Sequence, residues 1–305
     1  MIMLKLTKRQ YGILLALLGA TLYAVNAPFS KIVLDYLPPI LTAGFLYLGS
    51  GLGMLAIASF RSRHGTDNVE KKLDRKEWPY VLAMIALDIV GPICLMVGLQ
   101  KTTAANASLL SDFEIVATAL LAWLFFRERI SKRLWVGIAF VTLSCCVLSC
   151  EEMDSLRFSS GSLYVILAAF CWGLDNNCTR RIASKDPMQI VLMKGIFSGV
   201  GMLLVGFLIG ETIEVIWPIF AAMAIGLVSY GLSVFVDIYA QRSLGAARTS
   251  AYYAVAPFIG TGLSLLIFRQ TPPHTYWVGL ALMAVGAWLC AKDSFDDKIN
   301  MLNDN

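Results

Sequence analysis

The chain has little charge and few of the side chains that soluble enzymes use for catalysis. Only 15% of its residues are charged, and its two histidines are His64 and His274. None of the seven cysteines shows CxxC spacing, and all lie in or at the ends of apolar segments, which predicts packing residues rather than a metal or redox site. The patterns GxxxxGKS and GxxxxGKT do not occur either. The sequence thus predicts no cofactor, no metal and no nucleotide hydrolysis.

Apolar residues, by contrast, make up 57% of the chain, and the mean hydropathy is +0.68. Charged residues form about a quarter of a typical soluble domain, so this composition indicates a membrane protein. A window of about 20 apolar residues spans roughly 30 Å of hydrocarbon. The sequence contains ten such windows, at residues 11–34, 40–60, 79–99, 104–126, 134–150, 161–179, 187–209, 218–239, 246–268 and 275–290. The predicted fold class is therefore an all-α integral membrane protein that crosses the bilayer many times.

The basic residues predict the orientation of these helices, because Lys and Arg in short loops are retained on the cytoplasmic side. With a cytoplasmic N-terminus, 20 of the 25 basic residues fall on the inner side and four on the outer side. The remaining one, Lys194, lies within a predicted helix. A wrong helix count would spoil this asymmetry. We therefore predict ten transmembrane helices with the N- and C-termini both cytoplasmic.

The two halves of the chain are similar to each other. YAVNAPFSKIVLDYLPPI from Tyr23 aligns with WGLDNNCTRRIASKDPMQI from Trp172, which matches Asn26 with Asp175. The offset of roughly 140 to 150 residues corresponds to five helices, an odd number, so the halves must have opposite topology. Inverted repeats are a transporter architecture with the site near mid-membrane. The predicted divisions are a first five-helix repeat in 1–155, a second in 156–292 and a polar cytoplasmic tail in 293–305.

Four phrases of the sequence carry a likeness to a known family: NAPFSKIVLDYLPP, GLQKTTAANASLL, LLAWLFFRERIS and QRSLGAARTSAYYAVAPFIGTGLSLLIFRQTPP. In this order and spacing they resemble the drug/metabolite transporter superfamily, specifically its EamA-type permeases. The resemblance implies a carrier of the bacterial-type inner membrane, often an exporter of amino acids or related metabolites. It also implies a central cavity lined by helices 1, 3, 4, 6, 8 and 9. One departure is helix 4, which reads FEIVAT where such proteins usually have a proline, whereas helix 9 keeps Pro257.

Two acidic residues are predicted near the middle of transmembrane helices, Asp88 in the third and Glu114 in the fourth. A charge at the helix centre costs about 2.5 to 3.5 kcal/mol on insertion scales, so such residues usually face the protein interior or a water-filled cavity. We interpret both as candidates for carrying a proton or binding a substrate. Asp112 lies about 200° around the same helix from Glu114. It is expected to be an interfacial carboxylate that reaches water or caps an exposed turn.

Other polar and aromatic residues within the predicted helices have two interpretations each. Asp175 and Lys194 are expected to lie at a similar depth, where they either form a structural ion pair or belong to the site. Asn26 and Asn176 either make hydrogen bonds between helices or contact the substrate. Three aromatic residues either line an apolar cavity or only pack: Trp172, Tyr252 and Tyr253.

Three classes of function fit these features. A secondary transporter accounts for the repeat, the mid-membrane acids and the lack of soluble domains; it would export a small metabolite or amino acid by alternating access, with proton coupling as one option. An intramembrane enzyme would need convergent catalytic residues, and the sequence has neither a Ser-His arrangement nor a metal cluster. A sensor or assembly subunit would need a partner surface, and the tail SFDDKINMLNDN is short and polar. We therefore predict a transporter and not an enzyme.

The predicted partners are a small-molecule substrate and the lipid bilayer of a bacterial-type inner membrane. The basic run 70–77 has no interleaved aromatic residue, so nucleic acid is not expected. GxxxG pairs begin at Gly49, Gly195 and Gly206. Such pairs permit close approach of helices and would allow a homodimer.

Overall fold

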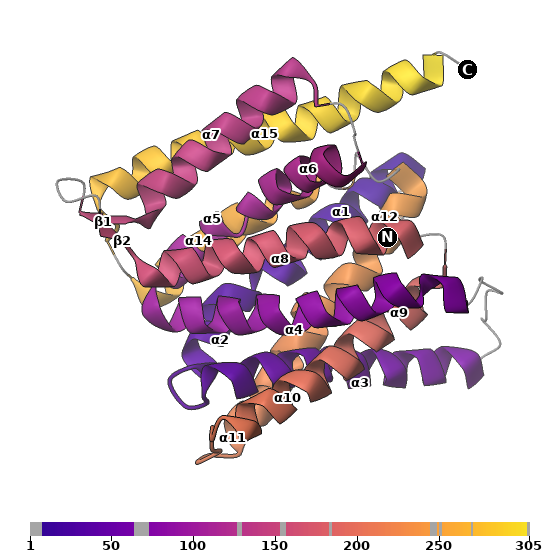
Figure 1. The fold of residues 1–305 in the computed structure, drawn as a ribbon, viewed down its shortest axis with the longest axis vertical. Coiled ribbons are helices and arrows are strands. Elements are labelled where there is room, and N and C mark those ends of the chain that lie inside the picture. The colour runs from indigo at the N-terminus through magenta and orange to yellow at the C-terminus, as the bar shows by residue number, and fades with distance from the viewer. Residues whose placement is uncertain are drawn as a thin grey trace, which may run out of the picture.

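Helices account for almost all of the protein in its computed structural model (Figure 1). The structure describes residues 8–63, 73–126, 130–152, 157–182, 185–244, 249, 252–269 and 271–303. The helices lie side by side in one bundle, with a short antiparallel hairpin of β1 (Cys150–Glu152) and β2 (Arg157–Phe158) at one end. The start of α1 (Lys8–Ala24) and the end of α15 (His274–Asn303) lie at the opposite end (Figure 1).

The first half of the chain folds into helices, and two of its predicted spans are broken in the middle. Its remaining elements are α2 (Asn26–Val33), α3 (Pro39–Arg63), the 3-10 turn η1 (Arg75–Glu77), α4 (Trp78–Lys101), α5 (Ala104–Leu110), α6 (Phe113–Phe126) and α7 (Lys132–Ser149). A turn at Val25 separates α1 from α2. Pro28 lies in the first turn of α2, where the missing N–H leaves no helical hydrogen bond unmade.

The turn between α5 and α6 breaks the fourth predicted span without a proline. The Ser111 hydroxyl donates to the carbonyl of Ala107 over 2.9 Å. The N–H groups of Asp112 and Glu114 bond to the carbonyl three residues back instead of four, at 3.1 and 3.0 Å. A serine that bonds back to the preceding turn competes with the helical ladder. The segment 104–126 is therefore two helices, not the single helix that its length predicts.

The second half contains π-helical turns within two of its spans. Its elements are α8 (Ser160–Ile182), α9 (Pro187–Met193), the π-helical η2 (Lys194–Ser198), α10 (Gly199–Leu208), α11 (Trp217–Gly226), the π-helical η3 (Leu227–Leu232), α12 (Ser233–Leu244) and α14 (Ala256–Phe268). The carboxylate of Asp186 caps α9 by accepting from the N–H of Met188 over 2.9 Å. π-Helical turns are rare and frequent at functional sites, and Lys194 begins η2.

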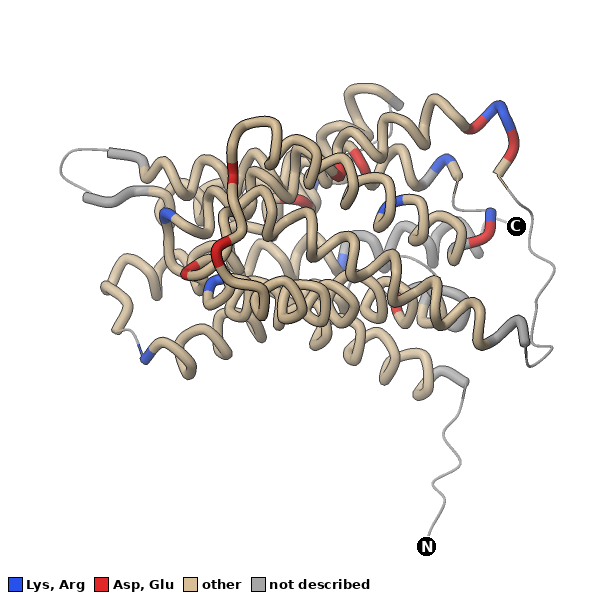
Figure 2. Tube along the Cα trace, turned by 90° about the horizontal axis from the view of Figure 1, so that it is seen from below, with Lys and Arg blue, Asp and Glu red and all other residues tan. Residues whose placement is uncertain are grey.

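Eight helical segments of the described residues are long and apolar enough to cross a membrane, at 10–33, 39–60, 75–101, 104–125, 132–149, 188–208, 217–237 and 274–292. The span predicted at 161–179 is the 23-residue α8, and the span predicted at 246–268 contains α14, an apolar helix of 13 residues. Residues 245–248, 250 and 251 lie outside the described chain. Charged residues are few along the bundle (Figure 2). The protein is thus a helical integral membrane protein with one short hairpin.

One predicted repeat boundary lies outside the described residues, and the other falls within a helix. The boundary between residues 155 and 156 falls in 153–156, outside the described residues. The last span was expected to end at Cys290, before a polar tail at 293–305. The helix α15 instead continues to Asn303, so much of the predicted tail is helical.

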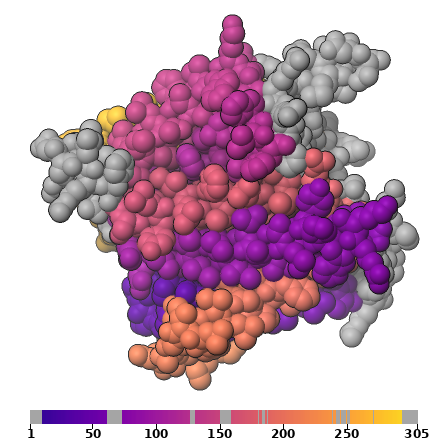
Figure 3. Space-filling model, in the orientation of Figure 1, coloured from indigo at the N-terminus to yellow at the C-terminus, as the bar shows by residue number. Residues whose placement is uncertain are grey.

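Helices of the two halves pack against each other in pairs. α8 lies along α4 and α6, α7 along α15, and α1 along α12; Figure 3 shows α8 directly against α4 at the surface. Small residues permit these contacts, because an added Cβ at Gly173 of α8 would lie 2.6 Å from the Cβ of Ala117 on α6. Gly195, from one GxxxG pair, meets Gly51 of α3. Gly195 therefore makes a close contact between two helices of the same chain.

Candidate functional site

A carboxylate and an amide meet between α6 and α8, at mid-length of the bundle. Asn176 Nδ2 donates to Glu114 Oε1 over 2.6 Å and lies 3.3 Å from the hydroxyl of Thr118. Glu114 is in the first turn of α6, directly after the break. Gly173 lies one turn before Asn176 and lets the two helices touch here. Asn176 is exposed and Glu114 only half-buried, so the carboxylate is accessible.

A buried ion-pair trio lies beside this pair. The Lys194 ammonium contacts Asp175 Oδ2 and lies 3.2 Å from Asp88 Oδ2. The two aspartates are 4% and 1% exposed. Tyr47 donates to Asp88 Oδ1 over 3.2 Å, and Thr179 donates to Asp175 Oδ1 over 3.3 Å. Because two carboxylates face one ammonium, the trio has no surplus positive charge.

Tyrosine rings connect the trio to the first transmembrane segment. The rings of Tyr47 and Tyr230 lie 4.8 Å apart, and Tyr230 and Tyr23 meet edge-on at 6.1 Å. The Tyr230 hydroxyl accepts from Asn26 Nδ2 over 2.7 Å. Asn26 Oδ1 in turn accepts from Ser30 over 3.0 Å. The buried polar groups therefore form one connected set across α2, α3, α4 and η3.

Tyr23 and Tyr253 form an aromatic wall near the carboxylate of Glu114. Their ring centroids are 5.7 Å apart. The Tyr253 hydroxyl is fixed by Ser233, 2.9 Å away. Tyr23 lines the same pocket as Ser111, which lies three residues before Glu114 in the chain. The two rings thus come from the first and ninth predicted spans and lie near the start of α6.

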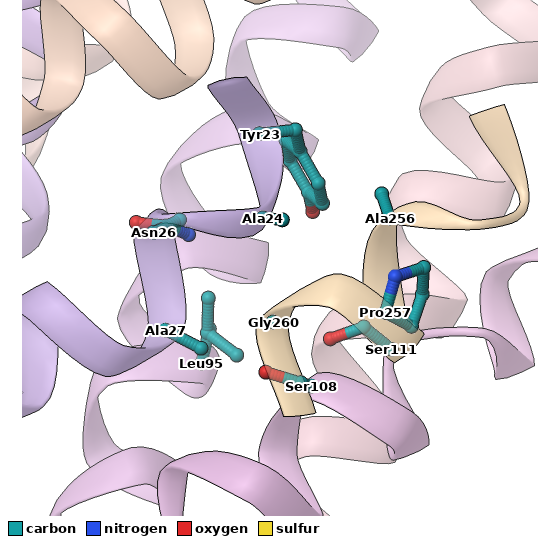
Figure 4. A pocket seen from close by; sticks show the side chains of 10 residues that line it. All are labelled: Tyr23, Ala24, Asn26, Ala27, Leu95, Ser108, Ser111, Ala256, Pro257 and Gly260. Carbon is teal, nitrogen blue, oxygen red and sulfur yellow. The ribbon is translucent and has the colours of Figure 1, made fainter. Parts of the chain in front are cut away.

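A pocket adjoins this wall where three spans are interrupted. Its lining comes from the α1–α2 break, the α5–α6 break, α4 and the start of α14: Tyr23, Ala24, Asn26, Ala27, Leu95, Ser108, Ser111, Ala256, Pro257 and Gly260. Figure 4 shows that Tyr23, Ser108 and Pro257 surround this space from three different helices. Ser111 is one turn before Glu114, whose N–H bonds to the Ser111 carbonyl over 3.0 Å. The pocket therefore adjoins the break that precedes Glu114.

Residues 10–150 and 159–291 match the EamA-like transporter family. The chain belongs to this family. It is 24% identical over 300 residues to an uncharacterized transporter of Methanothermobacter thermautotrophicus, covering 92% of this chain and 86% of that protein. It is 21% identical over 286 residues to the uncharacterized inner membrane transporter YedA of Escherichia coli K12, covering 90% and 87%. The mouse solute carrier family 35 member F2 is 28% identical over 246 residues, covering 75% of this chain and 59% of that protein.

A solved crystal structure has the same fold as this EamA-like transporter. Its TM-score is 0.65 at 17% sequence identity, and the match covers 93% of this chain and 98% of the other. At this identity the likeness concerns the fold alone. The bundle described above is therefore an architecture already seen experimentally.

The structure brings most of the predicted site residues of this EamA-like transporter together. Asp175 and Lys194 form the ion pair expected of them, and Asp88 joins it. Trp172 is buried and packs against Gly91 of α4, where an added Cβ would lie 3.4 Å from its Nε1 atom. Tyr252 is half-buried, and no hydrogen bond or ring contact among the described residues ties it to the cluster.

Asp112 does not reach water as expected. It is 4% exposed, and its Oδ2 atom has no hydrogen-bond partner among the described residues. It lies in the turn between α5 and α6, where the protein encloses its side chain. The sequence interpretation also missed Tyr47 and Tyr230. Their hydroxyls could have identified them as site residues, because a buried tyrosine hydroxyl in an apolar span usually has a polar partner.

Proposed function

We propose that this EamA-like transporter is a secondary transporter that exports a small solute across a bacterial-type inner membrane by alternating access. The observation that carries the proposal is the accessible pair of Glu114 and Asn176, which lies among broken helices in an otherwise apolar bundle. Ionisable residues at such depth usually mark a substrate or ion pathway. The family and the printed names of the relatives support transport.

The site supports an inverted repeat of five and five helices. Ser30 donates to Asn26 in the first span, and Thr179 donates to Asp175 at the same relative positions in the sixth. The fourth span is broken before α6, and a turn likewise precedes α14 in the ninth. The pairing of α4 with α8 has its counterpart in the pairing of α12 with α1. Two such halves can rock around a shared central site.

The proposed topology has ten spans and both termini in the cytoplasm. The first repeat comprises residues 1–155, the second 156–292, and the tail 293–305 is cytoplasmic. The basic-residue asymmetry supports this orientation. The start of α1 and the end of α15 lie at the same end of the bundle (Figure 1), as an even number of spans requires.

Glu114 is proposed as the central functional group. It either carries a coupling proton or binds the polar end of the solute. Asp88 is the weaker candidate, because Lys194 already neutralises it within the trio. The energy would come from an ion or solute gradient, since the sequence lacks a phosphate-binding motif.

Reconstitution tests the proposal against the two other classes of function. Comparing metabolites in the medium of overexpressing and deletion strains would identify candidate solutes. Purified protein in liposomes should then move one of them from a loaded to an empty compartment. A sensor, an assembly subunit or an intramembrane enzyme would leave the solute distribution equal to that of empty liposomes.

A further inference from the structure

We infer that the solute is a small organic amine, bound as its ammonium ion by Glu114, rather than an amino acid or an organic anion. This inference rests on the proposed transport function and names its substrate class. It concerns three joined features: the carboxylate of Glu114, the tyrosine wall of Tyr23 and Tyr253, and the pocket beside them.

The charges of the site favour a cation. Lys194 is the one basic residue that the structure places in this cluster among the described residues, and both Asp88 and Asp175 hold it. Even with one of these aspartates protonated, the trio has no positive charge left for a carboxylate ligand. The described hydrogen-bond partner of Glu114 is the neutral amide of Asn176. Among the described residues, no Lys or Arg side chain forms a hydrogen bond or ion pair with Glu114.

The helix starts at the site offer little to an anion. The positive end of α6 is already next to a carboxylate, because Glu114 lies in its first turn. At the start of α14, Pro257 has no N–H. The N–H groups of Phe258 and Ile259 both bond to the Val255 carbonyl at 3.1 Å. An amino-acid carboxylate would thus lose its hydration and gain only neutral side-chain donors such as the Ser108 hydroxyl.

The aromatic wall suits the cationic end of an amine. Tyrosine faces attract ammonium groups that lie within about 6 Å of the ring centroid. The Tyr23 ring lines the pocket together with Ser111, three residues before Glu114, the Tyr253 ring packs on it with centroids 5.7 Å apart, and the Tyr253 hydroxyl is fixed by Ser233. An ammonium ion between carboxylate and rings would gain both a charge-assisted hydrogen bond and a cation–π contact. A carboxylate there would face the negative ring faces.

An apolar pocket lies beside the break that precedes Glu114, and the chemistry of its lining suits the uncharged part of an amine. Small apolar side chains form most of its wall, including Ala24, Ala27 and Leu95, and the Ser108 and Ser111 hydroxyls contribute polar atoms. Ser111, on the wall of this pocket, lies one turn before Glu114 in the chain. A short branched or aromatic alkylamine therefore matches these features: its ammonium group suits the carboxylate and the rings, and its hydrocarbon part suits the apolar pocket.

Three ligands that share a 3-methylbutyl group and differ in their charged groups separate the alternatives. Isopentylamine, leucine and 4-methylpentanoate all have a branched chain. At neutral pH the first is a cation, the second carries both charges, and the third is an anion. Phenethylamine, phenylalanine and 3-phenylpropanoate form a second set with a larger body. Isothermal titration calorimetry on the purified full-length protein in detergent should show the amine of at least one set binding about tenfold or more tightly than its two relatives.

Two variants test whether the amine binds at Glu114. Glu114→Gln should weaken amine binding by about tenfold or more, because a charge-assisted hydrogen bond is lost. Glu214→Gln makes the same change on an exposed loop and should leave binding unchanged. Absent binding of both amines, equal binding of leucine or 4-methylpentanoate, or an unaffected Glu114→Gln variant would overturn the inference.

The binding test and the transport test can fail independently of each other. Calorimetry in detergent needs no membrane gradient, so amines that bind without moving into liposomes would overturn the transport function and leave the site intact. Liposomes that move leucine or an anion in preference to the amines would support transport and overturn the substrate class.

Discussion

Asn176 of α8 donates a 2.6 Å hydrogen bond to the Oε1 atom of Glu114 on α6, and this bond joins the two halves of the chain at an accessible point within the bundle. An amide can orient a carboxylate but cannot neutralise it. Glu114 therefore differs from Asp88 and Asp175, which share the ammonium of Lys194. The difference favours Glu114 over the trio as the proposed binding group, because the two aspartates already share a counter-ion.

Asp112→Asn should not lower thermal stability. The Oδ2 atom of Asp112 is buried without a hydrogen-bond partner among the described residues, and an unpaired buried charge is costly. The amide keeps the shape and removes the charge. Thermal unfolding in detergent should give a midpoint equal to or above that of the wild type. A loss as large as that of Asp175→Asn would mean that Asp112 has a stabilising partner.

Lys194→Gln should destabilise the protein strongly. It leaves Asp88 and Asp175 facing each other in a buried site, and breaking a buried ion pair costs about 3 to 5 kcal/mol. Asp175→Asn should cost less, since Asp88 remains beside the ammonium. Converting all three residues to neutral amides should restore most of the loss. Unfolding midpoints and membrane protein levels measure this order, and equal losses in the single and triple variants would rule out a stabilising trio.

Cysteine labelling should report opposite sides for two exposed positions. Asp74, before η1, is predicted to be cytoplasmic, and Glu214, between α10 and α11, is predicted to be external. In a background without the natural cysteines, an impermeant maleimide added to whole cells should label Glu214→Cys but not Asp74→Cys. Inverted membrane vesicles should give the reverse. The opposite pattern would contradict the proposed topology.

The apolar windows predicted most of the membrane segments, because a bilayer imposes length and composition on each helix separately. The α8 segment shows the limit of that signal. It does not qualify by length and hydropathy among the described spans, and Asp175, Asn176 and Asn177 lie within it. These polar residues lower the hydropathy of α8 and also contribute to the site.

The details of the site depend on helix rotation and helix breaks, which the sequence signals weakly. The depths of Asp175 and Lys194 indicated an ion pair, but the inclusion of Asp88 depends on how α4 turns against α8 and η2. The break at Ser111 and Asp112 has no proline to announce it. It is this break that buries Asp112 and places Glu114 in the first turn of a new helix.

Gradient-driven transport by Glu114→Gln in proteoliposomes tests the account most directly. The solute should be the one that overexpressing strains release, and Glu214→Gln should serve as the matched control on an exposed loop. We expect both variants to insert at wild-type levels, because glutamine keeps the hydrogen bond to Asn176. The control should transport like the wild type and Glu114→Gln should lose transport, since its neutral amide offers no negative charge to a cation and cannot exchange a proton. Wild-type transport by Glu114→Gln throughout about pH 5 to 8 would contradict the central role of this carboxylate.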